Sequence, residues 1–128
     1  MSEAQAIVLV VVEDEQDFRI LIRAALREDP RLQMRGEATD AQAAVEVARE
    51  AEPGLIILDN YLEGTVSGLE AAPMLKAAVP EAKILLLTSY DLAAEARREP
   101  AIDAYLRKDQ IDQLLPTAQR LLGLDPAA

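Results

Sequence analysis

Carboxylates follow two of the hydrophobic segments of this chain, and their positions suit metal-assisted phosphoryl chemistry. Glu13 and Asp14 come directly after the apolar run 7–12, and Asp59 directly follows the run 55–58. Carboxylates that meet in one crevice repel each other, and a divalent cation relieves that repulsion. Mg²⁺ suits such a site, because it prefers oxygen ligands and is usually held by one or two carboxylates together with phosphate oxygens. Asp59 could then attack phosphorus as a nucleophile.

A hydroxyl group and an amine follow two further segments. Thr88 directly follows the run 83–87, and Lys108 directly follows the short run 104–107. Thr88 can donate one hydrogen bond, and Lys108 can bring one mobile positive charge, to a phosphoryl group in transfer. Each residue alone has an ordinary explanation, since acids and threonines after strands commonly cap helices or turns and lysines are commonly solvated. The occurrence of all these groups at the ends of apolar runs favours the phosphoryl interpretation.

Two residue types that are missing narrow the chemistry further. The chain has no Cys, which excludes disulfides and thiolate metal sites. It also has no His, which excludes Ser-His and Cys-His nucleophile pairs, His-ligated zinc and phosphohistidine. Any bound metal is therefore expected to be a hard cation held by oxygen.

Length and composition predict a single domain over residues 1–128, structured from about 6 to 123. A chain of 128 residues with 51% hydrophobic and only 3% aromatic residues is expected to build one aliphatic core. The net charge of -10 disfavours direct contact with nucleic acids and anionic membranes. The longest apolar run, 6–12, is far shorter than the roughly 20 residues of a membrane span. We therefore expect a soluble, cytoplasmic protein.

Hydrophobic periodicity predicts strands that alternate with amphipathic helices. The expected strands are 7–12, 32–36, 55–58, 83–87 and 104–107. Alternation of this kind is typical of a parallel sheet with right-handed crossovers and helices on both faces. In such sheets ligands bind beyond the carboxyl ends of the strands, where Glu13, Asp14, Asp59, Thr88 and Lys108 are all expected.

Several helix boundaries are also predicted. The first helix is expected to turn Phe18, Leu21, Ile22, Ala25 and Leu26 inward and to end at Asp29-Pro30. Thr39 or Asp40 caps the second helix, and Ser67 and Glu70 have capping-box spacing for the third. Pro73 predicts a late start or a kink in that third helix. Asp109 or Asp112 is expected to cap the last helix.

Four stretches together resemble a known family. They are Val11-Val12-Glu13-Asp14-Glu15, Leu58-Asp59 with Gly68-Leu69-Glu70 beyond it, Leu87-Thr88-Ser89, and Tyr105-Leu106-Arg107-Lys108-Asp109. In this order they resemble the receiver domains of two-component response regulators. The resemblance implies a flavodoxin-like (βα)5 doubly wound sheet with strand order 2-1-3-4-5. It also implies that a histidine kinase or phosphotransfer protein phosphorylates Asp59, with Mg²⁺ at Glu13, Asp14, Asp59 and the backbone carbonyl of Tyr61.

The resemblance further implies a conformational switch. In the family the hydroxyl at the Thr88 position moves inward on phosphorylation and the Tyr105 ring follows. This remodels the face formed by the fourth helix, fifth strand and fifth helix, which controls an output domain, a downstream protein or homodimer formation. Lys108-Asp109 and Phe18-Arg19 are similar to the subfamily often joined to helix-turn-helix DNA-binding domains.

The sequence departs from the family pattern in three places. The loop after Asp59 has Glu63 where proline is usual and is one residue longer before Gly68. The stretch 98–103 lacks the usual glycine and contains Pro100, which is expected to shorten the fourth helix. Tyr61 and Tyr90 stand two residues after Asp59 and Thr88, where side chains of the family flank the phosphoryl group. They either pack at the rim or hinder hydrolytic water and prolong the phosphorylated form.

Three other functions compete with this interpretation. A receiver-like module that works without phosphorylation usually lacks the acidic pair, the acceptor or the lysine, and this chain has all of them. A phosphate-ester hydrolase of the haloacid-dehalogenase type would have an acid two residues after its nucleophile, where this chain has Tyr61. A nucleotide-binding domain needs a glycine-rich turn after the first strand, and none of the five glycines lies there. Residues 122–126 fit either a natural tail or the start of a linker.

Overall fold

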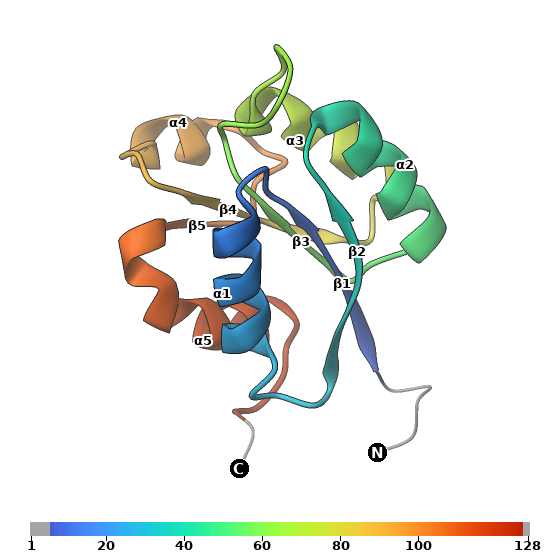
Figure 1. Ribbon diagram of the computed structural model, residues 1–128, viewed down its shortest axis with the longest axis vertical. Coiled ribbons are helices and arrows are strands. Elements are labelled where there is room, and N and C mark those ends of the chain that lie inside the picture. The colour runs from blue at the N-terminus through green and yellow to red at the C-terminus, as the bar shows by residue number, and fades with distance from the viewer. Residues whose placement is uncertain (1–5, 127–128) are drawn as a thin grey trace.

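The five predicted strands form one parallel sheet in a computed structural model that describes residues 6–126. Of the predicted tails, before residue 6 and after residue 123, residues 1–5 and 127–128 lie outside the described residues. The strands are β1 (Ile7–Val12), β2 (Leu32–Ala38), β3 (Leu55–Leu58), β4 (Lys83–Thr88) and β5 (Ala104–Arg107). Their order is β2-β1-β3-β4-β5, which confirms the predicted doubly wound topology (Figure 1).

Both faces of the central strands are buried. Along β1, Leu9 and Val11 pack into the core on one face of the sheet, and Val10 and Val12 pack into the core on the other. The aliphatic residues of β3 and β4 alternate between the two cores in the same way. A strand covered on both faces needs apolar side chains at every position, which explains the unbroken aliphatic runs in the sequence.

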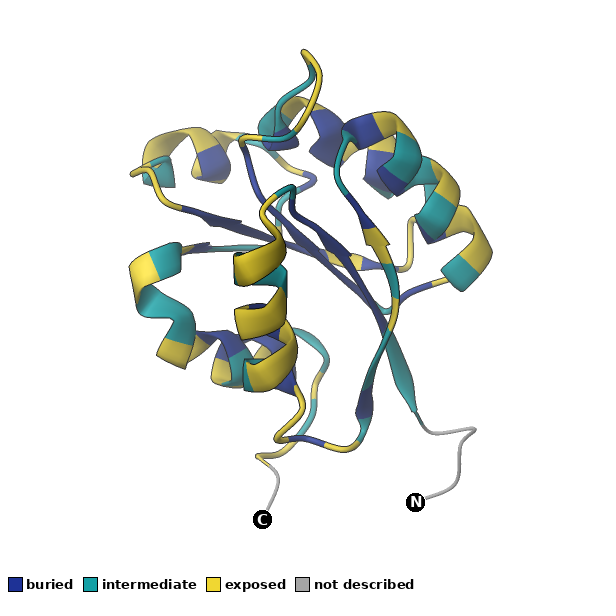
Figure 2. Ribbon diagram, in the orientation of Figure 1, coloured by how far each residue is buried: buried dark blue, intermediate teal, exposed yellow. Residues whose placement is uncertain are grey.

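The helices divide between the two faces of the sheet. α1 (Gln16–Leu26) and α5 (Leu114–Leu121) cover one face, and α2 (Ala41–Ala51), α3 (Gly68–Ala78) and α4 (Ala93–Arg98) cover the other (Figure 1). Buried residues line the sides of the helices that face the sheet, and exposed residues line their outer sides (Figure 2). The short α4 ends before Pro100, as predicted.

Side-chain caps fix the starts of α2 and α3. The Asp40 carboxylate accepts a hydrogen bond from the Ala43 amide at 2.8 Å. Ser67 and Glu70 form the predicted capping box, so α3 begins at Gly68 and continues through Pro73. The predicted late start of α3 was therefore wrong. The capping box satisfies the first amides of the helix, while Pro73 removes only one backbone hydrogen bond from its interior.

The last helix begins differently from the prediction. A 3₁₀ helix, Lys108–Gln113, precedes α5, and no side chain caps α5 at Gln113. The capping roles predicted for Asp109 and Asp112 were therefore wrong. Asp109 instead pairs with Arg107, whose amide donates to the Gln110 side chain at 3.0 Å and so begins the 3₁₀ turn.

One predicted inward residue of α1 faces outward. Leu21 is 52% exposed, whereas Ile22 and Leu26 are buried and Phe18 is half-buried against the same core. The buried stripe of this helix follows positions 18, 22 and 26, and Leu21 lies beyond its edge.

No helix within residues 6–126 is both long enough and apolar enough to cross a membrane.

Candidate functional site

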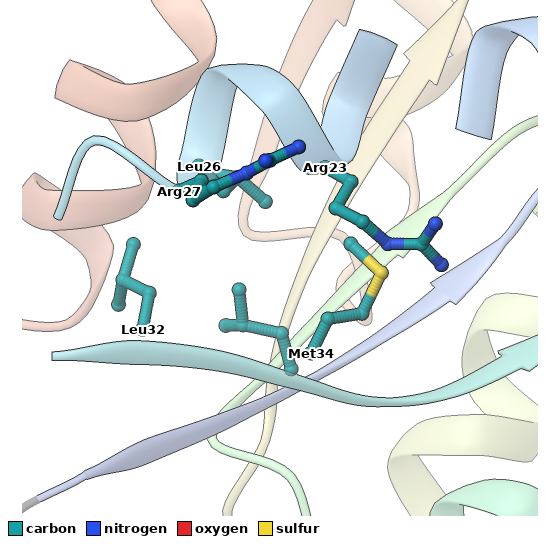
Figure 3. Close-up of a pocket in the computed structure, with 6 residues that line it drawn as sticks. Arg23, Leu26, Arg27, Leu32 and Met34 are labelled. Carbon is teal, nitrogen blue, oxygen red and sulfur yellow. The ribbon is translucent and has the colours of Figure 1, made fainter. Parts of the chain in front are cut away.

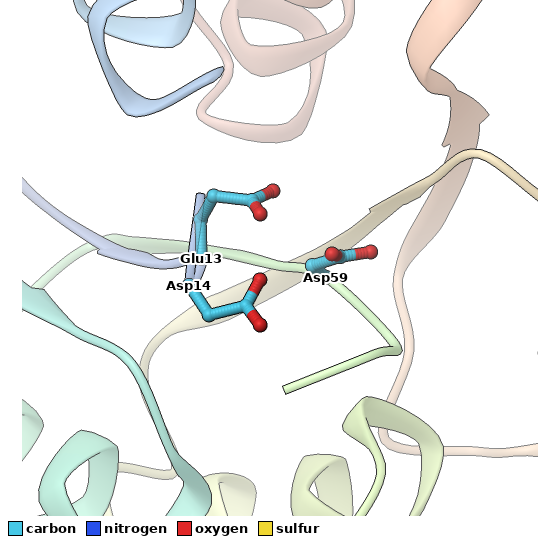
Figure 4. Close-up of side chains that lie close together, drawn as sticks. All are labelled: Glu13, Asp14 and Asp59. Carbon is cyan, nitrogen blue, oxygen red and sulfur yellow. The ribbon is translucent and has the colours of Figure 1, made fainter. Parts of the chain in front are cut away.

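The ends of β1 and β3 bring three carboxylates together. Val12 is in register with Leu58 on the neighbouring strand, so the residues that follow them leave the sheet side by side. Glu13, Asp14 and Asp59 each place one carboxylate oxygen within 4.8 Å of the others (Figure 4). The sequence predicted this cluster, because carboxyl ends of parallel strands share one edge of a sheet.

Lys108 provides the positive charge of the site. It follows β5 directly, and its Nζ lies 2.9 Å from Glu13 Oε1 and 3.2 Å from Asp59 Oδ2. A third carboxylate oxygen, Oε1 of Glu15, lies 3.3 Å from the same nitrogen. Glu15 was not among the predicted site residues, although its place directly after the acidic pair could have indicated it. The ammonium group therefore joins the ends of β1, β3 and β5.

Thr88 brings a free hydroxyl to the same place. It ends β4, is fully buried, and its Oγ1 has no hydrogen-bond partner among the described residues. Buried hydroxyl groups are normally paired, so an unpaired one at a cleft is available to a ligand. The cleft has a volume of about 350 Å³. It is lined by Asp14, Glu15, Asp59, Tyr61, Thr88, Ser89, Tyr90 and Lys108.

Burial and mutual charge shift the pKa values of this cluster. Burial raises the pKa of Glu13 to about 7, and the nearby Asp59 charge adds to that rise, while Lys108 opposes it. Burial disfavours the charged form of Lys108, but Glu13 and Asp59 outweigh it and raise the lysine pKa above its ordinary value. Negative charge is therefore in excess at the strand ends, and one carboxylate is close to taking up a proton at neutral pH.

The donor set fits a hard divalent cation. Every candidate ligand is a carboxylate oxygen, and Glu13 Oε1 is buried with the Lys108 ammonium 2.9 Å away. Oxygen ligands of this kind suit Mg²⁺ better than softer metals. The Tyr61 backbone carbonyl, predicted as a further ligand, belongs to a residue that lines the cleft.

Asn60 and Gly68 hold the backbone that carries Asp59. The Asn60 amide donates to Asp59 Oδ1 at 2.7 Å, and its side-chain oxygen accepts from the Leu69 amide at 2.9 Å. A Cβ atom on Gly68 would lie 2.1 Å from the Asp59 carbonyl oxygen, so the start of α3 touches the acceptor backbone and requires glycine. Asn60 was not among the predicted site residues, and its only sign in the sequence was its position between an acid and a capping box.

The long loop after Asp59 is attached to the start of α2. Glu63 forms an isolated parallel bridge with Asp40, and its amide donates to the Thr39 carbonyl at 3.0 Å. Gly64 follows with a φ of +86°, which glycine adopts without strain. The unusual residue Glu63 thus fixes the loop to a neighbouring helix.

Two tyrosines meet at the rim of the cleft. The rings of Tyr61 and Tyr90 have centroids 4.6 Å apart and an interplanar angle of 58°, and both residues are more than half exposed. Behind them, the Tyr105 hydroxyl donates to the Tyr90 carbonyl at 2.8 Å and accepts from the Leu92 amide at 3.0 Å. Tyr105 is thereby connected to the loop that carries the rim.

A second hollow lies between α1 and β2, away from the strand ends. It has a volume of about 270 Å³, with Leu9, Leu26, Leu32 and Met34 as apolar lining and Arg23 and Arg27 above them (Figure 3). Its lining has no carboxylate or hydroxyl group. It therefore lacks the groups that phosphoryl transfer requires, and the chemistry concentrates at the strand ends.

Comparison with known proteins agrees with this arrangement. Residues 9–119 match the model of the response regulator receiver domain. The chain therefore belongs to the response regulator receiver family, the phosphoacceptors of two-component signalling, and the resemblance found in the sequence is confirmed.

Individual relatives support the same assignment. The response regulator protein VraR of Staphylococcus aureus (strain Mu3) is 31% identical over 102 residues, which cover 78% of this chain and 48% of VraR. The chain thus spans about half the length of the curated relatives it matches. A LuxR-family response regulator from Aurantimonas sp. SI85-9A1 has the same fold, with a TM-score of 0.84 and 24% identity, over 92% of this chain and 86% of that chain. NtrX from Brucella abortus matches with a TM-score of 0.78 and 27% identity, over 92% and 27% of the two chains.

Proposed function

We propose that this chain accepts a phosphoryl group on Asp59 from a histidine kinase or a phosphotransfer protein in the cytoplasm. The observation that carries the proposal is the convergence of Asp59, Lys108 and the unpaired Thr88 hydroxyl in one cleft beside two further carboxylates. An ordinary cluster of surface acids would include neither a buried unpaired hydroxyl nor a lysine that pairs with the acceptor and has only 10% of its side chain exposed.

Each group has a distinct role in the transfer. An Asp59 carboxylate oxygen attacks phosphorus, a new O–P bond forms, and the bond between phosphorus and the donor breaks. Lys108, 3.2 Å from Asp59, offsets the negative charge of the incoming phosphoryl oxygens. Thr88 donates a hydrogen bond from its hydroxyl to one of those oxygens. The hydroxyl is available because no atom of the described residues is hydrogen-bonded to it.

Glu13, Asp14 and Asp59, with the backbone carbonyl of Tyr61, would hold Mg²⁺. When bound, the ion would supply positive charge that offsets the repulsion of the carboxylates for the incoming phosphoryl group. Burial raises the pKa of Glu13 to about 7, and the nearby Asp59 charge adds to that rise. This supports the assignment, because a bound cation stabilises a buried carboxylate and relieves its repulsion with Asp59.

Phosphorylation would be transmitted through Thr88 and Tyr105 to the face formed by α4, β5 and α5. The Tyr105 hydroxyl supports this path, because it binds the loop that begins directly after Thr88. We infer that the switched face controls an output domain, a downstream protein or a homodimer, without direct contact between this domain and nucleic acid. An interaction module that works without phosphorylation is disfavoured, because the acceptor, the acidic pair and the lysine are all present and in contact range.

Intact mass spectrometry tests the proposed acceptor directly. Incubation with Mg²⁺ and phosphoramidate should add the mass of one phosphoryl group to the wild type and none to Asp59→Asn. Asp112→Asn, at an exposed aspartate of the 3₁₀ helix, is the matched control and should still form the adduct. Removal of divalent cations with EDTA should abolish the reaction. An adduct that persists in Asp59→Asn, or never forms in the wild type, contradicts the proposal.

A further inference from the structure

The ring of Phe18 lies against the lysine of the site. The Lys108 Nζ is 4.4 Å from the centre of the ring, within the range of a cation–π contact. Phe18 is the third residue of α1, and it also packs against the core beneath α1 and α5. The end of β5 and the start of α1 therefore meet at this ammonium group.

The ring is the only uncharged partner among the described contacts of the Lys108 ammonium, and this gives it a separate role. Glu13 and Asp59 contact the same nitrogen, but they are also carboxylates proposed to bind a metal ion. The third carboxylate, Glu15 at 3.3 Å, is 70% exposed, so solvent screens its attraction for the ammonium. When Glu13 and Asp59 bind a metal ion, they attract the Lys108 ammonium less strongly. An aromatic face attracts a cation through its quadrupole. Because the ring has no net charge, it does not compete for the metal ion or the phosphoryl group.

We propose that Phe18 is a positioning residue, which holds the Lys108 ammonium group beside Asp59 during phosphoryl transfer through a cation–π contact. The inference rests on the proposed function, because it assigns a support to the lysine of that reaction. Plain core packing is the competing explanation. A leucine at position 18 would satisfy packing, as Ile22 and Leu26 do farther along the helix, but it would not attract the ammonium.

The composition of the chain permits an unusually direct test. Phe18 is its single phenylalanine, so growth on fluorinated phenylalanine alters only this ring. Successive fluorination withdraws electron density from the aromatic face while nearly preserving its shape. The initial rate of adduct formation with phosphoramidate and Mg²⁺ should fall from 4-fluoro- to 3,5-difluoro- to 3,4,5-trifluorophenylalanine. We expect a total loss of about two- to tenfold.

Two point variants complete the series. Phe18→Tyr retains an aromatic face and should react at nearly the wild-type rate, whereas Phe18→Leu should be as slow as the trifluorinated protein. In a Lys108→Gln background, fluorination should change the residual rate no further, because no ammonium remains to be held. If Phe18→Leu fails to fold, the fluorinated series still decides the question.

A measurement without phosphorylation tests the contact itself. The ¹⁹F resonance of 4-fluorophenylalanine at position 18 should shift when Lys108 is changed to Gln in the absence of divalent cations. A rate independent of fluorination, or an equal effect of fluorination in the Lys108→Gln background, overturns the inference. Failure of the unlabelled wild type to form any adduct would instead overturn the proposed function, and the resonance would still report whether ring and ammonium interact.

Discussion

Glu13 shows how closely charge is balanced at the scale of single residues. Among residues 6–126, Lys108 is the one cation paired with the carboxylates of Glu13, Glu15 and Asp59, and it cannot neutralise all of them. Burial makes the remaining charge expensive, so the pKa of Glu13 rises to about 7. A proton and a divalent cation are two ways to relieve the same repulsion. A proton neutralises one carboxylate, whereas a bound cation leaves all of the carboxylates ionised.

The tyrosine pair at the rim leads to a prediction about the lifetime of the phosphorylated protein. Tyr61 and Tyr90 contact each other and line the cleft that contains Asp59, so we expect their rings to obstruct the approach of water to a phosphoryl group there. Replacement of both by Ala should shorten the lifetime of the adduct about threefold, as expected when a weak aromatic barrier is removed. Intact mass, followed over time after removal of the phosphodonor, measures the decay.

Met74→Ala is the matched control for the tyrosine variants. Met74 is also a large, partly exposed side chain, but it lies on α3 and does not line the cleft. Its replacement should leave the decay rate unchanged. Equal lifetimes for the wild type and the double tyrosine variant would show that the rings pack at the rim without protecting the phosphoryl group.

At the scale of elements, the three central strands were predictable because their unbroken aliphatic runs are what a doubly covered strand requires. β1, β3 and β5 have the predicted bounds, and β4 extends only to include Thr88. The start of α5 was not predictable in the same way. Asp109 and Asp112 both have the residue type of a cap, and only the contact of Asp109 with Arg107 and the 3₁₀ turn decide against them.

The site shows the same division between strand order and side-chain geometry. Glu13, Asp14, Asp59, Thr88 and Lys108 were predictable as neighbours, because each directly follows or ends a strand. Phe18 and Asn60 were not, because their roles depend on the rotation of α1 and on the path of the loop after β3. Neither of these quantities is encoded by a short spacing in the sequence.

Asp29 connects three elements and leads to a prediction about stability. Its buried carboxylate accepts hydrogen bonds from Arg31 at the start of β2 and from Gln119 of α5, the latter at 3.0 Å. These bonds, above all those from Arg31, hold the pKa of Asp29 well below its usual range. Asp29→Asn should lower the free energy of unfolding at pH 7 by about 1–3 kcal/mol, as measured by urea denaturation.

The pH dependence of the Asp29 variant gives the sign of the effect. Because the folded-state pKa is below the unfolded value, the stabilisation is complete above the ordinary aspartate pKa of about 4 and is lost as the pH falls below it. The difference in stability between wild type and Asp29→Asn should therefore narrow progressively as the pH falls below about 4. Asp112→Asn, at an exposed position, should follow the wild type. A difference that stays constant with pH would mean that Asp29 acts by shape alone.

At the scale of the whole molecule, the loop between β4 and α4 connects the chemical site to the face proposed for output. It begins after Thr88, whose hydroxyl is unpaired in the cleft, and it carries Tyr90 at the rim. Tyr105 of β5 binds the same loop on its other side, at the Tyr90 carbonyl and the Leu92 amide. A movement of Thr88 toward a phosphoryl group would therefore disturb contacts that reach β5 and α4.

Tyr105→Phe should weaken the effect of phosphorylation at the site on the face formed by α4, β5 and α5. The variant keeps the ring and removes the hydroxyl, so the Leu92 amide loses its acceptor. Hydrogen exchange at the Leu92 amide should become about fivefold faster, as expected for the loss of one net hydrogen bond. Hydrogen exchange with mass spectrometric detection, before and after phosphorylation, measures both the loop and the α4–β5–α5 face. Phosphorylation should still form the adduct in the variant, but it should change exchange in α4 and β5 less than in the wild type. Tyr61→Phe removes a different hydroxyl from the cleft rim and should respond like the wild type. An equal response of Tyr105→Phe and wild type would mean that the hydrogen bonds of the Tyr105 hydroxyl do not transmit the change.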